Sequence, residues 1–107
     1  MGVLLAIAVV FNGYIPDLEI LRGDANNDTT INTSDPVYIS SFLYQGGNAP
    51  PCKDAADVND DGSLDNSDVI YLYQFLFMGG SPPASPYPYC DLDTTSDDLD
   101  CLNSACS

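Results

Sequence analysis

The sequence predicts a small, mainly α fold: two similar loop–helix units packed together, an extended apolar N-terminal segment and an irregular C-terminal tail. A twelve-residue pattern of Asp and Asn occurs twice, starting at residue 24 and again at residue 57. Each copy is followed by a helix-length stretch that ends in Gly-Gly. Beyond the second copy the chain becomes rich in Pro, Asp and Cys, which favour irregular structure. We therefore divide the chain into an apolar segment (1–21), a repeat domain (22–80) and a tail (81–107).

The second copy, DVNDDGSLDNSD at 57–68, has the pattern of a calcium loop. Oxygen-bearing side chains occupy loop positions one, three, five, nine and twelve, namely Asp57, Asn59, Asp61, Asp65 and Asp68. Gly62 at position six permits the positive φ of a sharp turn, and Ser63 at position seven offers its carbonyl oxygen. Because calcium takes about six to eight oxygen ligands, this alternation of ligands predicts one bound calcium ion.

The first copy, DANNDTTINTSD at 24–35, repeats these positions. Its predicted ligands are Asp24, Asn26, Asp28, Asn32 and Asp35, with the carbonyl of Thr30. Two Asp/Asn-rich surface turns are the alternative interpretation. Two copies in register, each followed by the same helical pattern, favour a pair of calcium ions instead.

The two predicted sites differ in charge and in backbone strain. Site two offers four carboxylates and Gly62, whereas site one offers three carboxylates and has Thr29 at position six. A β-branched residue at positive φ is strained by about 1–3 kcal/mol. We therefore expect site two to bind calcium more tightly.

The composition excludes several classes of function. Sixteen acidic residues against Lys53 and Arg22 give a net charge of −14, which argues against nucleic acid and disfavours an anionic membrane. The chain has no histidine, and no nucleophile stands beside a base, so we expect neither an enzyme nor a small-molecule substrate. Two carboxylates about 4 Å apart repel by about 4 kcal/mol at an effective dielectric near 20. Folding should therefore be coupled to calcium.

The four cysteines, Cys52, Cys90, Cys101 and Cys106, lack metal-binding spacing. Disulfides in an extracellular compartment are the better interpretation, and three pairings are possible. We favour Cys90–Cys101 with Cys52–Cys106, because the first closes a compact acidic loop. Extracellular modules bind calcium with dissociation constants of about 10⁻⁴–10⁻³ M, so a calcium-binding module agrees with that compartment.

Two helices are predicted, Ser34–Gln45 and Ser67–Met78, each ended by a glycine. Prolines at 16 and 50–51 argue against a helix before either loop. The second helix is apolar on all sides, which predicts burial on all sides.

The apolar run VLLAIAVVF at 3–11 is the obvious cover for that helix, from this chain or a neighbour. The run is too short to span a bilayer. A signal-peptide core is an alternative, although no basic residue precedes the run. We expect the run to be ordered and buried against this domain, a lipid phase or another copy. In the tail, the Pro-rich sequence of 81–89 predicts a polyproline-like linker. The acidic stretch that follows predicts a solvated loop rather than a further cation site.

Loops of the form D-x-N-x-D that end in Asp, each followed by one helix, resemble a dockerin domain over about 22–80. The resemblance implies two loop–helix units packed antiparallel with pseudo-twofold symmetry, each binding calcium. It also implies that a helix face docks on a cohesin module, with recognition pairs at Thr33–Ser34 and Asn66–Ser67. Where cohesin binders commonly carry a basic pair in mid-helix, this chain has Ser40–Ser41 and Tyr73–Gln74.

We predict an extracellular structural module that mediates protein–protein assembly. Its partner is either other copies of itself, joined head-to-tail into filaments through residues 1–21, or a cohesin-type scaffold. A glycan is a further possibility, on Asn27 within Asn27-Asp28-Thr29 or on Ser/Thr at 81–88 and 94–96.

Overall fold

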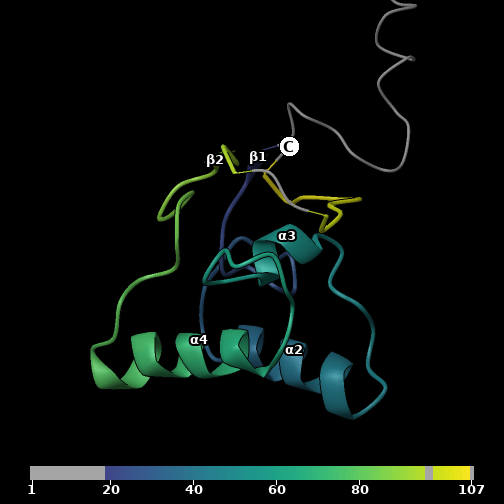
Figure 1. The fold of residues 1–107 in the computed structure, drawn as a ribbon, viewed down its shortest axis with the longest axis vertical. Helices are drawn as coiled ribbons and strands as arrows, with labels where there is room; N and C mark the ends of the chain where they lie inside the picture. The colour runs from purple at the N-terminus through teal and green to yellow at the C-terminus, as the bar shows by residue number, and fades with distance from the viewer. Residues whose placement is uncertain (1–18, 96–97, 107) are drawn as a thin grey trace, which may run out of the picture.

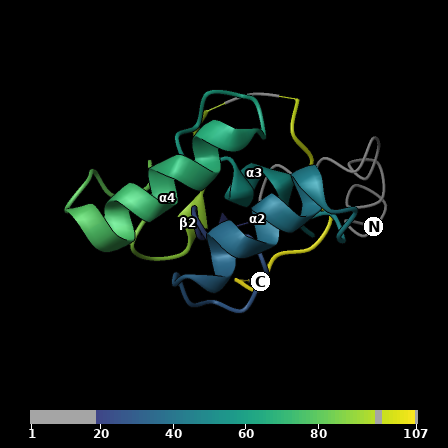
Figure 2. The same cartoon turned by 90° about the horizontal axis from the view of Figure 1, so that it is seen from below.

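The two loops and the helices that follow them form the body of the molecule (Figure 1). The computed structural model describes residues 19–95 and 98–106, so the apolar run at 3–11 lies outside the described residues. The described residues form α2 (Ser34–Tyr44), α3 (Lys53–Ala56) and α4 (Asn66–Met78), with a short antiparallel pair of β1 (Glu19–Ile20) and β2 (Asp91–Leu92). Helices α2 and α4 pack side by side, and the strand pair lies at the opposite end (Figures 1 and 2).

Both predicted helices are confirmed to within one residue at each end. Each ends at a glycine in the left-handed region, Gly46 with φ 70° and Gly79 with φ 68°. The next amide in each unit, from Gly47 or Gly80, donates to a helix carbonyl at 2.9 Å. The same hydrogen bond therefore terminates both helices, because glycine adopts positive φ without a steric cost.

The hydrophobic core combines equivalent residues of the two units. Ala25 and Val58 follow the first ligand of their loops, and Ile39 and Leu72 lie one turn into α2 and α4; all four are fully buried. The hydroxyls of Tyr38 and Tyr71 donate to carbonyls eleven residues later, those of Ala49 at 3.3 Å and Pro82 at 2.7 Å. Each tyrosine thus ties the chain that leaves a helix back to that helix.

One helix was not predicted. Residues Lys53–Ala56 form the single turn α3 directly before the second loop, so the expectation that no helix precedes either loop is wrong there. Pro50 and Pro51 prevent a helix through themselves, but Cys52 is extended with φ −126° and starts a new turn beyond them. The buried Ala55 and Ala56 then place α3 against the core.

The cover expected over the rest of α4, from the run at 3–11 or from a neighbouring copy, lies outside the described residues. Within the described residues, α2 covers only one side of α4, where Val69 and Leu72 are buried. Ile70, Phe77 and Met78 are exposed, the last two by 65% and 77%. None of the helices in the described ranges is both long enough and apolar enough to cross a membrane.

The disulfides join Cys52 to Cys101 and Cys90 to Cys106, so the favoured pairing is wrong. The tail returns beside the entry to α3, where the Asp54 amide donates to the Asp100 carbonyl at 3.2 Å and the Leu102 amide to the Pro51 carbonyl at 3.1 Å. These bonds align Cys101 with Cys52, which is 2% exposed. The short spacing between Cys90 and Cys101 did not predict the disulfide, because the antiparallel pairing of the tail with residues 51–54 decides which cysteine faces Cys52.

We predict that the two disulfides stabilise the fold unequally. Cys52–Cys101 spans 49 residues and Cys90–Cys106 spans 16. Loop-closure entropy gives about 4 and about 3 kcal/mol for these loops. Replacing Cys52 and Cys101 by Ala should therefore lower the free energy of unfolding more than replacing Cys90 and Cys106, as measured by urea denaturation in calcium. Equal losses would contradict this ranking.

Candidate metal centres

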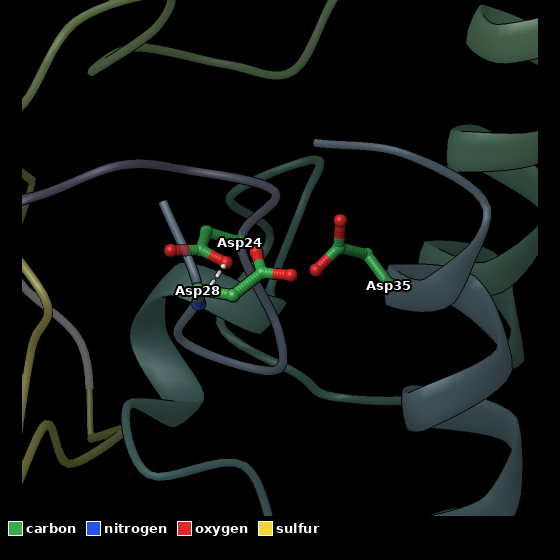
Figure 3. A group of neighbouring side chains, drawn as sticks. All are labelled: Asp24, Asp28 and Asp35. Carbon is green, nitrogen blue, oxygen red and sulfur yellow. Dashed lines mark hydrogen bonds between the residues drawn. The ribbon is translucent and has the colours of Figure 1, made fainter. Parts of the chain in front are cut away.

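Three carboxylates of the first loop gather at one point. Asp24 starts the loop, Asp28 lies at its fifth position, and Asp35 comes from the first turn of α2 (Figure 3). One oxygen of each lies within 4.8 Å of the others. Carboxylate oxygens brought together in this way are the ligands that calcium prefers.

Backbone amides hold these carboxylates in place. Asp35 is fully buried and accepts from the amides of Ala25 and Asn32, both at 2.9 Å. Asp24 accepts from the amide of Asp28 at 3.0 Å (Figure 3) and from that of Thr29 at 2.9 Å. The loop therefore curls around its own first and last carboxylates, and the last one also fixes the loop to α2.

The side-chain oxygen of Asn26, a predicted ligand, is buried and finds no hydrogen-bond partner among the described residues. Its amide nitrogen donates to the hydroxyl of Ser34 at 2.9 Å, which fixes the orientation of the group. A buried polar atom without a partner costs about 1–3 kcal/mol. A cation beside Asp35, whose carboxylate accepts from the backbone amide of Asn26 at 3.3 Å, would remove that cost. The residues of the first loop thus fit a bound cation.

The second loop repeats this geometry with Asp57, Asp61 and Asp68, whose oxygens also lie within 4.8 Å of one another. Asp68 accepts from the amides of Val58 at 2.8 Å and Asp65 at 3.0 Å. Asp57 accepts from the amide of Gly62 at 2.9 Å and from that of Asp61 at 3.3 Å. The oxygen of Asn59, unlike that of Asn26, accepts a hydrogen bond, from the Asp61 amide at 3.3 Å.

The side chains at the ninth loop positions make hydrogen bonds of their own. Asn32 and Asp65 turn toward the helix starts, where each side-chain oxygen accepts from a backbone amide at 3.0 Å, of Ser34 and Ser67 respectively. Asp65 is absent from the gathered carboxylates. A helix cap and a metal ligand are compatible at this position, because position nine often reaches calcium through a water molecule.

The backbone takes the left-handed region at positions four and six of both loops. Asn27 and Asp60 have φ of 67° and 57°, while Thr29 and Gly62 have φ of 67° and 84°. The expected strain at Thr29 is therefore present, since its Cβ is branched and the equivalent Gly62 carries none.

The gathered carboxylates disfavour their own charge when no cation is bound. Burial, opposed in part by backbone hydrogen bonds, raises the pKa of Asp35 to about 6, and the charges of Asp24 and Asp28 add to the increase. Burial likewise raises the pKa of Asp68 to about 7, with the charge of Asp57 also contributing. A divalent cation would reverse this effect by stabilising the charged carboxylates.

Sequence reasoning missed the role of Arg22, which is fully buried beside the second loop. Its guanidinium lies 3.4 Å from Asp54, 3.6 Å from Asp60 and 3.0 Å from Asp93. Burial acts to raise the pKa of Asp93, but hydrogen bonds with Asp54 and Thr95 and the charge of Arg22 outweigh it and lower the pKa to about 2. The available signal was the position of Arg22, one of two cations, directly before a calcium loop.

We predict opposite pH responses with and without metal. A folded-state pKa raised above the ordinary 3.8 gives a stabilisation that is present at low pH and is lost as pH rises through about 6 for Asp35 and about 7 for Asp68. The metal-free protein should therefore melt at a higher temperature at about pH 5 than at about pH 8. With saturating calcium the order should reverse, because protons compete with the ion. Melting by circular dichroism checks both; the same slope in both states would contradict the prediction.

Comparison with known proteins confirms the resemblance that the loops suggested. The model of the dockerin type I domain matches residues 22–77, which include both loops, α2 and nearly all of α4. No curated protein and no solved structure matches the chain significantly. Because the match covers more than half of the chain and both gathered carboxylate groups, this protein belongs to the dockerin type I family.

Proposed function

We propose that this dockerin domain binds two calcium ions, one in each loop, and uses its ion-ordered helix pair to hold proteins together outside cells. Dockerin domains are calcium-binding interaction modules of secreted proteins, not a catalytic family. Two disulfides fit an oxidising compartment. The observation that carries the proposal is the unpartnered, buried oxygen of Asn26 in a loop with three gathered carboxylates.

Each ion would be held by side-chain oxygens, one backbone carbonyl and the position-nine residue. The first set comprises Asp24, Asn26, Asp28, Asp35, the carbonyl of Thr30, and Asn32 through water. The second comprises Asp57, Asn59, Asp61, Asp68, the carbonyl of Ser63, and Asp65 through water. Bound calcium would cross-link the start of each loop to the first turn of its helix. We further infer that the two units are related by a pseudo-twofold axis, which the equivalent core residues and helix ends support.

We predict that the second site binds calcium more tightly than the first. Site two has four carboxylates and unstrained Gly62, while Thr29 in site one holds a positive φ. In calorimetric titrations, Asp57→Ala should abolish the tighter binding step and Asp24→Ala the weaker one. Equal losses from the two changes would contradict the prediction.

A glycine substitution tests whether strain causes the difference. Thr29→Gly should strengthen site one by about fivefold, as expected from releasing about 1 kcal/mol of strain. Thr30→Gly is the matched control, because Thr30 does not share the positive φ of its neighbour. It should leave the affinity unchanged or lower it.

The surface of the helix pair carries a repeated set of exposed apolar side chains, which we call the apolar stripe. The stripe comprises Val37 and Tyr44 of α2 and Ile70, Tyr73, Phe77 and Met78 of α4. Residues spaced by three, four or seven share one face of a helix. Val37 and Ile70 are equivalent in the repeat, as are Tyr44 and Phe77. Exposed apolar side chains that gather on one face mark interaction sites, and aromatic residues are enriched there.

We infer that the apolar stripe binds residues 1–21 of a neighbouring copy, so that copies join head-to-tail and extend into filaments. The apolar run at 3–11 and the stripe have matching chemistry. Such a contact is heterologous, and it extends into a filament when the rotation between copies does not close into a ring. Anchoring to a cohesin-type scaffold is the second candidate, favoured by membership of the dockerin family.

We predict that assembly needs both surfaces and calcium. Deleting residues 1–13 should reduce a calcium-dependent polymer to monomers in analytical ultracentrifugation, because the donated segment is lost. Phe77→Ser should do the same, whereas Leu102→Ser, at the same exposure of 65% but outside the stripe, should not. A monomeric wild type that binds a cohesin module through the stripe would instead support the anchor.

A glycan on Asn27, or on Ser/Thr of 81–88 and 94–96, stays a prediction. Asn27 is half-buried, and its side-chain oxygen accepts from the amide of Ala105 at 2.6 Å. A sugar attached to the amide nitrogen of Asn27 would have to extend into solvent between the first loop and the C-terminal tail. The intact mass of the secreted protein tests for it.

A further inference from the structure

Arg22 joins the two calcium loops although it belongs to neither set of ligands. It is fully buried and lies two residues before Asp24, the first ligand of the first loop. The chain has only one other cationic side chain, Lys53. Burying a charged guanidinium is costly unless it is paired and hydrogen-bonded, so its contacts show what it organises.

The guanidinium of Arg22 holds the start of the second loop. Its Nη1 atom donates to the carbonyls of Asp54 at 2.7 Å and Asp57 at 3.1 Å. Its Nη2 atom lies 3.6 Å from the carboxylate of Asp60, which is the left-handed fourth residue of that loop. Arg22 therefore contacts both the first ligand, Asp57, and the turn that follows it.

The backbone around Arg22 fixes the first loop to the same place. The amide of Gly23 donates to the carbonyl of Ala55 at 2.7 Å, and the amide of Arg22 donates to the carbonyl of Pro86 at 2.8 Å. Gly23 has a φ of 103°, which strains any other residue, and an added Cβ would lie 2.7 Å from Ile31 Cδ1 of the first loop, so the chain passes close to that loop here. Movement of one loop start would thus displace the other.

Arg22 also neutralises carboxylates that would otherwise compete for a cation. Asp54, Asp57 and Asp60 have carboxylate oxygens within 4.8 Å of one another, and the guanidinium lies 3.4 Å from the carboxylate of Asp54 and 3.6 Å from that of Asp60. The carboxylate of Asp93, 3.0 Å from Nη2, adds a further negative charge. Because the Arg22 guanidinium already compensates the charge of these groups, the carboxylate of Asp57 is available to bind a cation in the second loop.

We propose that Arg22 is a positioning residue that couples the two loops, so that calcium in one loop strengthens calcium binding in the other. The inference rests on the proposed function, since it needs two calcium sites. The physical basis is shared ordering. An ion that fixes one loop start also fixes Arg22 and its contacts with the other, so the second ion has less conformational freedom left to remove.

The test is a comparison of calcium affinities in calorimetry. Asp28→Ala silences site one, and the affinity of site two is then compared with that in the wild type. We expect coupling of about tenfold, which lies within the usual range for allosteric pairs. Silencing site two by Asp61→Ala should change site one by the same factor, because coupling is reciprocal.

The coupling factor should vanish in Arg22→Gln. The coupling factor is the affinity of one site with the other site intact, divided by its affinity with the other site silenced. If Arg22 only supported the fold, Arg22→Gln would lower both of these affinities and leave their ratio unchanged. A loss of the coupling factor itself therefore indicates positioning. Lys53→Gln is the matched control: it removes the same charge from a side chain whose ammonium lies over the Phe42 ring at 5.9 Å, and it should keep the coupling. Asp60→Asn keeps the carbonyl contacts of Arg22 and should weaken the coupling. It is the alternative test variant if circular dichroism shows that Arg22→Gln does not fold.

The outcomes separate this inference from the proposed function. Two ions that bind independently in the wild type, or coupling that survives both Arg22→Gln and Asp60→Asn, would overturn the role of Arg22 alone. A wild type that binds no calcium would overturn the proposed function and this inference with it.

Discussion

The last carboxylate of each loop carries the constraint on which the rest of the structure depends. Asp35 and Asp68 are fully buried in the first turn of a helix, yet they accept hydrogen bonds from the amides that begin their loops. Burial of charge is costly, and the amides offset only part of that cost, as the raised pKa of each carboxyl indicates. Loop and helix start therefore form one unit, in which a cation bound among the carboxylates would offset the repulsion between their like charges.

The sequence was sufficient for whatever depends on local spacing. The repeat located both loops, and a glycine with positive φ ended each helix within one residue of the expected position. The carboxylates expected at positions one, five and twelve do gather. The ligand pattern does not reveal the hydrogen bonds at position nine, where Asp65 caps α4 and Asn32 accepts from the amide of Ser34 at the start of α2.

What depends on contacts distant in the sequence could not be predicted. The pairing of Cys52 with Cys101 follows from the tail lying antiparallel to residues 51–54, and nothing in the spacing of cysteines specifies that register. The burial of Arg22 likewise requires carbonyls from Ser85 and Asp54, which are 63 and 32 residues away. Helix α4 shows a different limit: its composition predicts burial on all sides, but among the described residues α2 covers one side only, and composition does not say what covers the rest.

The positions of the ligands connect ion binding to the surface of the helix pair. Val37 and Ile70, the first members of the apolar stripe, lie two residues after Asp35 and Asp68. An ion that fixed those carboxylates would also fix the helix turn from which the stripe begins. Because α2 and α4 pack on each other through Ile39 and Leu72, the relative placement of the two halves of the stripe would then depend on both ions together. Under the proposed function, a partner that recognises both helices would thus depend on calcium without touching it.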